Sequence, residues 1–130
     1  MDIRTRSKRI VLIIDDEKGL DAILQECFNK RGYETVVAYD GKAGLELARS
    51  FEPDIIILDI NMPKMGGYAV AQILKNDEKL KVIPIVVLTV RDQLEDKEIA
   101  KEIGVAEFFT KPFKADDLAN EVDRLLKSNN

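Results

Sequence analysis

The sequence predicts an α/β fold in which a parallel sheet is covered by helices on both faces. Five short runs of apolar and β-branched residues recur along the 130 residues, and the stretches between them carry apolar residues at helical spacing. The runs at 10–14 and 55–58 are continuously apolar, which is typical of strands buried on both faces of a sheet. A chain of this length also lies in the common size range of a single domain.

Strands are expected at about 9–14, 34–38, 55–59, 85–89 and 106–110. Each strand leads into a stretch with helical periodicity, so the chain consists of five strand-helix units. The apolar residues expected to face the sheet are Leu20, Ile23, Leu24, Cys27 and Phe28 in the first helix, Leu45, Leu47 and Ala48 in the second, Val70, Ile73 and Leu74 in the third, and Leu118, Val122, Leu125 and Leu126 in the fifth.

The helix boundaries carry their own signals. Gly32 is placed to end the first helix, the second helix must end before Pro53, and Gly66 and Gly67 are expected to permit a tight turn into the third. The fourth helix, at about 92–103, has few apolar residues among many charges, and such weak burial suits a movable element. Its apolar side consists of Leu94, Ile99, Ala100 and Ile103.

Composition excludes several classes of protein. No apolar run approaches the ~20 residues of a membrane helix, and the basic N-terminus lacks a secretory core, so a cytoplasmic protein is expected. The single cysteine, Cys27, cannot form an intrachain disulfide and is interpreted as a small core residue. The absence of histidine excludes Ser-His-Asp catalysis and histidine metal sites, so any phosphohistidine would have to come from a partner.

The expected organisation is a short basic tail at 1–8, one domain at 9–127 and a tail at 128–130, with no output domain in this chain. The net charge of −4 disfavours direct nucleic-acid binding. The basic tail could touch an acidic partner, although its main expected role is solubility.

Functional side chains gather at the predicted strand ends. Asp15 and Asp16 follow the first strand, Asp59 ends the third, Thr89 ends the fourth, and Lys111 follows the fifth. The carboxyl ends of parallel strands share one edge of the sheet, where ligands bind. Close carboxylates repel each other by about 4 kcal/mol per pair at an effective dielectric near 20, and a bound cation would relieve this repulsion.

A small, partly open site made only of oxygen ligands suits Mg²⁺, with Mn²⁺ as an alternative. One carboxylate could then attack phosphorus to form an acyl phosphate, while an ammonium and a hydroxyl stabilise the phosphoryl oxygens. Asp59, alone at the end of a central strand, is the candidate nucleophile.

Each of these residues alone has an ordinary structural explanation. Asp16 could cap the first helix, Asp59 could form an Asx turn, and Thr89 could be a simple strand residue. Lys111 could be a solvated surface charge. Their joint placement at the ends of strands is difficult to attribute to independent accidents.

The segments VLIIDDE, IIILDINMPKMGG, IVVLTV and FFTKPF resemble the motifs of the bacterial response-regulator receiver domain, of the chemotaxis-regulator type. The resemblance covers essentially the whole chain. It implies a doubly wound, flavodoxin-like sheet of strand order 2-1-3-4-5 with five helices. It also implies phosphoryl transfer from a histidine kinase or histidine phosphotransfer protein, and signalling to a downstream protein through the face of the fourth helix, fifth strand and fifth helix.

The same resemblance implies a role for each matching residue. In these terms Asp59 is the phosphoacceptor, and Asp15, Asp16 and Asp59 hold Mg²⁺ with the backbone carbonyl of Asn61. Thr89 is the switch hydroxyl and Phe108 is the switch aromatic. Lys111 binds the phosphoryl group, and its peptide bond to Pro112 is cis. Phe108 has an alternative role as a core residue of an edge strand, and Phe109 is assigned to the core.

Two positions depart from the common family pattern. Val90 stands after Thr89 where a very small residue is usual, and Arg91 follows it. Our hypothesis is that Val90 crowds the approach of the hydrolytic water and lengthens the lifetime of the acyl phosphate.

Other classes of protein are also considered. An aspartate-nucleophile phosphohydrolase would have a similar acidic site, but such enzymes place D-x-D on the first strand and usually need a lid domain. A flavin-binding module would need hydroxyls and glycines where this chain has Asp15 and Asp16. The chain could also be the receiver part of a longer regulator with its own output domain.

Overall fold

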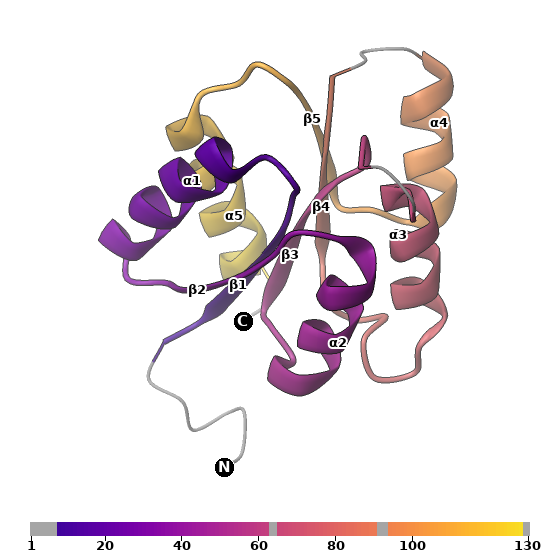
Figure 1. The fold of residues 1–130 in the computed structure, drawn as a ribbon, viewed down its shortest axis with the longest axis horizontal. Coiled ribbons are helices and arrows are strands. Elements are labelled where there is room, and N and C mark those ends of the chain that lie inside the picture. Colours follow the sequence, from indigo (N-terminus) through magenta and orange to yellow (C-terminus); the bar gives the residue numbers. More distant parts are fainter. Residues whose placement is uncertain (1–7, 63–64, 91–93, 129–130) are drawn as a thin grey trace.

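The computed structural model describes residues 8–62, 65–90 and 94–128. Within these ranges, strands and helices alternate strictly along the chain (Figure 1). The strands are β1 (Ile10–Ile14), β2 (Glu34–Ala38), β3 (Ile55–Asp59), β4 (Ile85–Thr89) and β5 (Glu107–Thr110). The helices are α1 (Lys18–Lys30), α2 (Gly41–Phe51), α3 (Gly67–Asn76), α4 (Leu94–Ile103) and α5 (Ala115–Ser128). Residues 92 and 93 of the fourth predicted helix, and Arg91, lie outside the described residues.

The strands form one parallel sheet of order β2-β1-β3-β4-β5, which confirms the expected order. The chain passes from β1 outward to β2 and then returns to the other side of β1 to form β3. The strand order therefore reverses between β1 and β3, and the crevice beyond their carboxyl ends is where this type of sheet binds ligands.

The helices cover the sheet on two faces. In Figure 1, α1 and α5 lie on one side of the sheet and α2, α3 and α4 lie on the other. β1, β3 and β4 are buried along their whole length because their alternate side chains enter two different cores. One core contains Leu45, Val70 and Leu74 with Leu12 and Ile56, and the other contains Leu24, Phe28, Leu118 and Val122 with Val11 and Ile57.

Four residues that the sequence places on the apolar sides of their helices are exposed. Ile23 is 58% exposed, and Ile73, Leu94 and Ile99 are also exposed. In α1 the buried positions are Asp21, Leu24 and Phe28, and Ile23 lies about 100° around the helix from Leu24. The apolar stripe read from the sequence is therefore wider than the face that the sheet covers.

The weak anchoring expected for α4 is confirmed by its burial. Only Asp96 and Ala100 are buried among its described side chains. The hydroxyl of Tyr68 on α3 donates a hydrogen bond to the backbone carbonyl of Asp96 at 3.0 Å. α4 thus rests on α3 with little apolar contact of its own.

The glycines at the helix ends serve different purposes. Gly32 follows α1 with φ of +91°, as expected for a residue that ends a helix. Gly66 has an ordinary φ of −67°, so its backbone conformation does not itself require glycine. Gly67 is needed for space, because a Cβ there would lie 2.4 Å from the Cα of Ile60 and 2.6 Å from the carbonyl oxygen of Asp59.

Among the described residues, no helix has the combination of length and apolar character that crossing a membrane requires.

Candidate functional site

Asp15 and Asp16 follow directly after β1. Asp15 is fully buried and Asp16 is exposed. Asp15 Oδ1 accepts a hydrogen bond from the backbone N–H of Glu17 at 2.7 Å, which holds the carboxylate at the start of α1. Glu17, and not Asp16, stands at the N-cap position of α1, so the capping explanation for Asp16 is wrong.

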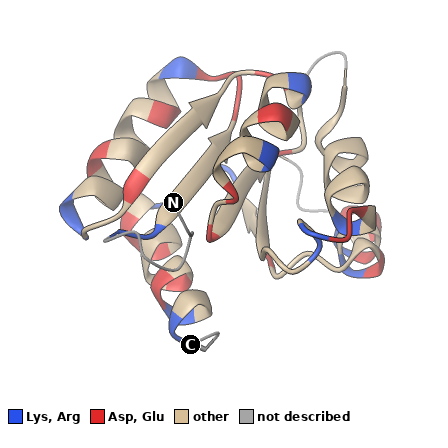
Figure 2. Cartoon of the chain, turned by 90° about the horizontal axis from the view of Figure 1, so that it is seen from below, with Lys and Arg blue, Asp and Glu red and all other residues tan. Residues whose placement is uncertain are grey.

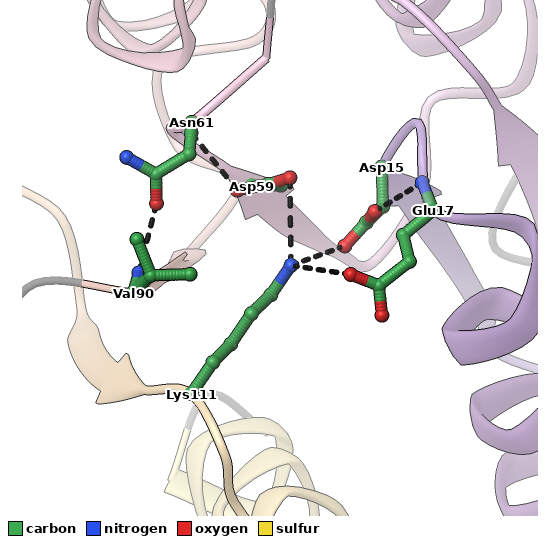
Figure 3. Close-up of polar contacts among 6 residues, drawn as sticks. All are labelled: Asp15, Glu17, Asp59, Asn61, Val90 and Lys111. Carbon is green, nitrogen blue, oxygen red and sulfur yellow. Dashed lines mark hydrogen bonds and ion pairs between the residues drawn. The ribbon is translucent and has the colours of Figure 1, made fainter.

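Asp59 ends β3, beside β1 in the sheet, and is also buried. Its Oδ1 accepts a hydrogen bond from the backbone N–H of Asn61 at 2.9 Å. This contact is the Asx turn considered as an alternative for Asp59. The turn orients the carboxylate and leaves Oδ2 facing the centre of the site, so it is compatible with a functional role (Figure 3).

Lys111 reaches into the same centre from beyond β5 (Figure 3). Its Nζ lies 3.3 Å from Asp15 Oδ2, 3.5 Å from Asp59 Oδ2 and 3.9 Å from Glu17 Oε1. The side chain is only 12% exposed, so Lys111 is not a solvated surface charge. Its peptide bond to Pro112 is cis, as the sequence resemblance implied.

Burial and charge compete at these groups. Burial is the main cause that raises the pKa of Asp15, the N–H of Glu17 lowers it, and the carboxylate of Asp59 raises it again. Burial lowers the pKa of Lys111, but the charges of Asp15 and Asp59 outweigh that effect, and the pKa lies above its usual value. The surroundings of the acidic site therefore keep Lys111 protonated and make negative charge on Asp15 unfavourable.

The acidic residues fit a metal ion. Carboxylate oxygens of Asp15, Asp16 and Asp59 all lie within 4.8 Å of one another, close enough to share one divalent cation directly or through a bound water. A donor set made only of carboxylate oxygens matches hard cations such as Mg²⁺ rather than zinc. The pKa of the buried Asp15 is raised, so added positive charge at the site would stabilise its ionised carboxylate.

The remaining predicted residues lie on the neighbouring strands. Thr89 is fully buried at the end of β4, opposite Thr110 in the register with β5. Phe108 on β5 is half-buried and packs against the core under α2, α3 and α4. Phe109 packs into the opposite core, with its ring 6.0 Å from that of Phe113, which confirms its assignment to the core.

Two contacts of the site were not foreseen from the sequence. The side-chain oxygen of Asn61 accepts a hydrogen bond from the backbone N–H of Val90 at 2.8 Å, so Asn61 joins the loops after β3 and β4. Glu17 adds a third carboxylate beside Lys111. The adjacency of Glu17 to Asp15 and Asp16 in the sequence was the available signal for it.

Comparison with known proteins agrees with this geometry. Residues 11–123 match the response regulator receiver domain family. Sporulation initiation phosphotransferase F of Bacillus subtilis is 35% identical over 122 residues, which cover 92% of this chain and 96% of that protein. The DNA-binding dual master transcriptional regulator RpaA of Synechocystis sp. is 35% identical over 117 residues, which cover 90% of this chain and 48% of that protein.

Solved structures show the same relationship. Chemotaxis protein CheY4 of Vibrio cholerae superposes with a TM-score of 0.86 at 30% identity, covering 91% of this chain and 98% of that one. The chain spans about half the length of the transcriptional regulators that it matches. It belongs to the response-regulator receiver domain family, whose members accept a phosphoryl group and act as switches in two-component signalling rather than as metabolic enzymes.

Proposed function

We propose that Asp59 accepts the phosphoryl group, from a phosphohistidine carried by a histidine kinase or a histidine phosphotransfer protein. An oxygen of the Asp59 carboxylate attacks phosphorus and forms the new P–O bond, while the P–N bond to the partner's imidazole breaks. The electron pair of that bond leaves with the imidazole nitrogen, which then takes a proton from solvent. The product on this chain is an acyl phosphate.

The observation that carries the proposal is the position of Lys111. Its Nζ lies 3.5 Å from Asp59 Oδ2 and is held in place by the buried carboxylate of Asp15. An ammonium so placed can bind an oxygen of a phosphoryl group on Asp59 and stabilise the charge that develops during transfer. The buried hydroxyl of Thr89 on the adjacent strand is proposed to bind another oxygen of the same group.

Asp15, Asp16 and the backbone carbonyl of Asn61 are proposed to hold Mg²⁺ together with Asp59, and Mn²⁺ would fit the same donors. When bound, the ion would neutralise charge on the phosphoryl oxygens and so favour attack by Asp59. In the same proposal the chain's own residues also promote hydrolysis of the acyl phosphate, so the receiver would catalyse both its phosphorylation and its dephosphorylation.

We further propose that phosphorylation acts through Thr89 and Phe108 on the surface formed by α4, β5 and α5. A phosphoryl group on Asp59 would attract Thr89 and open space for the ring of Phe108 to repack. The weak anchoring of α4, with Leu94 and Ile99 exposed, supports this element as the one that moves. A downstream protein would then bind the altered surface with a different affinity.

The functional unit in this proposal is residues 9–127, between a short basic tail at 1–8 and a tail at 128–130. We propose that it works in the cytoplasm, where two-component partners donate phosphoryl groups, and that it contacts proteins rather than nucleic acid. The formal charge of −4 supports the latter point, because nucleic acid would be repelled at long range.

The test is phosphorylation of Asp59→Asn by acetyl phosphate with Mg²⁺. The unchanged protein should gain the mass of one phosphoryl group, and the variant should gain none. Asp40→Asn is the matched control, because Asp40 caps α2 and asparagine caps equally well. Labelling that persists in Asp59→Asn, or that disappears in Asp40→Asn, would contradict the assignment.

A further inference from the structure

A polar pocket of about 350 Å³ opens at the amino-terminal end of the sheet, away from the acidic site. It is lined by residues from the start of β1, the end of α1 and the end of α5. Arg9 precedes β1 and Asp15 follows it, so the five residues of β1, about 17 Å of extended chain, separate this pocket from the site. The lining side chains are Lys8, Arg9, Arg31, Tyr33, Asp123 and Lys127.

The pocket has the opposite charge to the rest of the molecule. Four cations and one carboxylate line it, and a second carboxylate, that of Asp116, lies 3.5 Å from Arg31 Nη2. The local formal charge is therefore +2, in a chain whose total is −4. In Figure 2, which shows the molecule from below, a blue segment marks the last turn of α5. Such a concentration of positive charge within a concavity attracts anions.

The one carboxylate of the pocket is already engaged. Asp123 Oδ1 accepts a hydrogen bond from the hydroxyl of Tyr33 at 2.5 Å, and Oδ2 accepts one from Arg31 Nη1 at 2.8 Å. Burial, together with Asp123, raises the pKa of Tyr33 well above its usual value, so its hydroxyl remains protonated. Asp123 thus fixes the side chains of Tyr33 and Arg31 in the lining of the pocket. Lys8 and Lys127, by contrast, are exposed.

We propose that this pocket binds a small anion that carries phosphate groups. Guanidinium and ammonium groups together suit phosphate oxygens, which accept several charge-assisted hydrogen bonds at once. The volume of about 350 Å³ lies at the lower end of the range for small-molecule sites. A long acidic chain fits less well, because beyond the pocket it would meet a surface that is negative overall.

The experiment is an NMR titration of the ¹⁵N-labelled protein with inorganic pyrophosphate, in EDTA so that no cation bridges the anion to the acidic site. Amide shifts should centre on Arg9, Gly32, Tyr33 and Lys127. The double variant Lys8→Glu/Lys127→Glu should weaken binding by about tenfold or more, because it reverses two charges close to the ligand. Both positions are exposed, so the fold should be retained.

Lys97→Glu/Lys101→Glu is the matched control, since it makes the same change in net charge at exposed positions of α4, on the opposite face of the sheet (Figure 1). It should leave the affinity within about twofold. An equal loss in both double variants would show only long-range attraction and would overturn the proposal. Amide shifts centred elsewhere in the molecule would also overturn the proposal. So would the absence of amide shifts up to about 10 mM of added pyrophosphate.

Three further ligands distinguish the possible sources of the anion. Adenosine diphosphate binding more tightly than pyrophosphate would support the site and assign it to nucleotides, and equal binding would support it as a site for phosphate groups alone. A polyglutamate peptide or a short DNA duplex that binds at least tenfold more tightly than either would overturn the small-ligand class. The titration does not depend on Asp59, so Asp59→Asn should bind pyrophosphate unchanged.

Discussion

The ammonium of Lys111 lies 3.3 Å from Oδ2 of Asp15, although the two residues are 96 positions apart in the chain. Asp15 is fully buried and the Lys111 side chain is 12% exposed. This pair joins the end of the first strand to the segment after the last one. It sets the electrostatics of the site, and the first two predictions concern its members.

Asp15→Asn should remove a pH dependence of stability. The pKa of Asp15 in the folded protein is raised above the ordinary 3.8, chiefly by burial, so the folded state binds more protons than the unfolded state as this group titrates. The free energy of unfolding therefore falls as the pH rises from about 4 through the folded pKa. In Asp15→Asn this part of the fall should be absent.

Urea denaturation between pH 4 and 7 without divalent cations measures this dependence. Asp117→Asn is the matched control, because it removes an exposed carboxylate of α5 and should keep the fall. If the pH profile of Asp15→Asn matches that of the unchanged protein, burial of Asp15 is not the cause.

Lys111→Met should slow phosphorylation of Asp59 by acetyl phosphate. Methionine keeps much of the volume but removes the charge that lies 3.5 Å from Asp59 Oδ2. A charge-assisted contact of this kind contributes about 1.5–3 kcal/mol, so the expected loss in rate is about tenfold to a hundredfold. The rate of mass gain under fixed Mg²⁺ measures it.

Lys114→Met removes an exposed lysine three residues further along the chain and should phosphorylate at the normal rate. Comparable slowing in both variants would mean that the lysine at 111 has no special place in the reaction.

Gly67→Ala should destabilise the domain by about 2 kcal/mol or more. A Cβ at this position would lie 2.4 Å from the backbone of Ile60, so the start of α3 would have to move away from β3. Gly66→Ala should cost less than about 1 kcal/mol, since its Cβ would meet nothing within 4 Å and only a mild N-cap preference is lost. Chemical denaturation measures the free energy of unfolding of the two variants. Equal losses of stability would rule out the close approach of Gly67 to Ile60 as the cause.

Val90→Ala should shorten the lifetime of the acyl phosphate by about twofold to tenfold, which corresponds to at most about 1.4 kcal/mol of barrier. The backbone of Val90 is fixed to Asn61 beside the site, and its side chain is 60% exposed, where it can crowd an incoming water. The rate of dephosphorylation is measured as the decrease in phosphorylated protein after the phosphoryl donor is removed. An unchanged or slower rate would refute the hypothesis.

Short stretches of the sequence determine which strands are central and where the polar residues of the site lie. Continuous apolar runs such as 55–58 mark central strands because both of their faces must be buried, and the polar residues that end those runs must share one edge of a parallel sheet. The meeting of Asp15, Asp59 and Lys111 at that edge was therefore predictable from the residues, whereas the strand order was implied only by the family resemblance.

The tertiary structure alone decided which helix positions are covered. Helical periodicity identifies a stripe, but the width of the buried face depends on how each helix lies on the sheet, so Ile23 and Leu94 are exposed despite their apolar character. The basic pocket arises in the same way. Arg9, Arg31 and Lys127 come from separate segments, and only packing of the ends of α1 and α5 beside β1 brings their charges together.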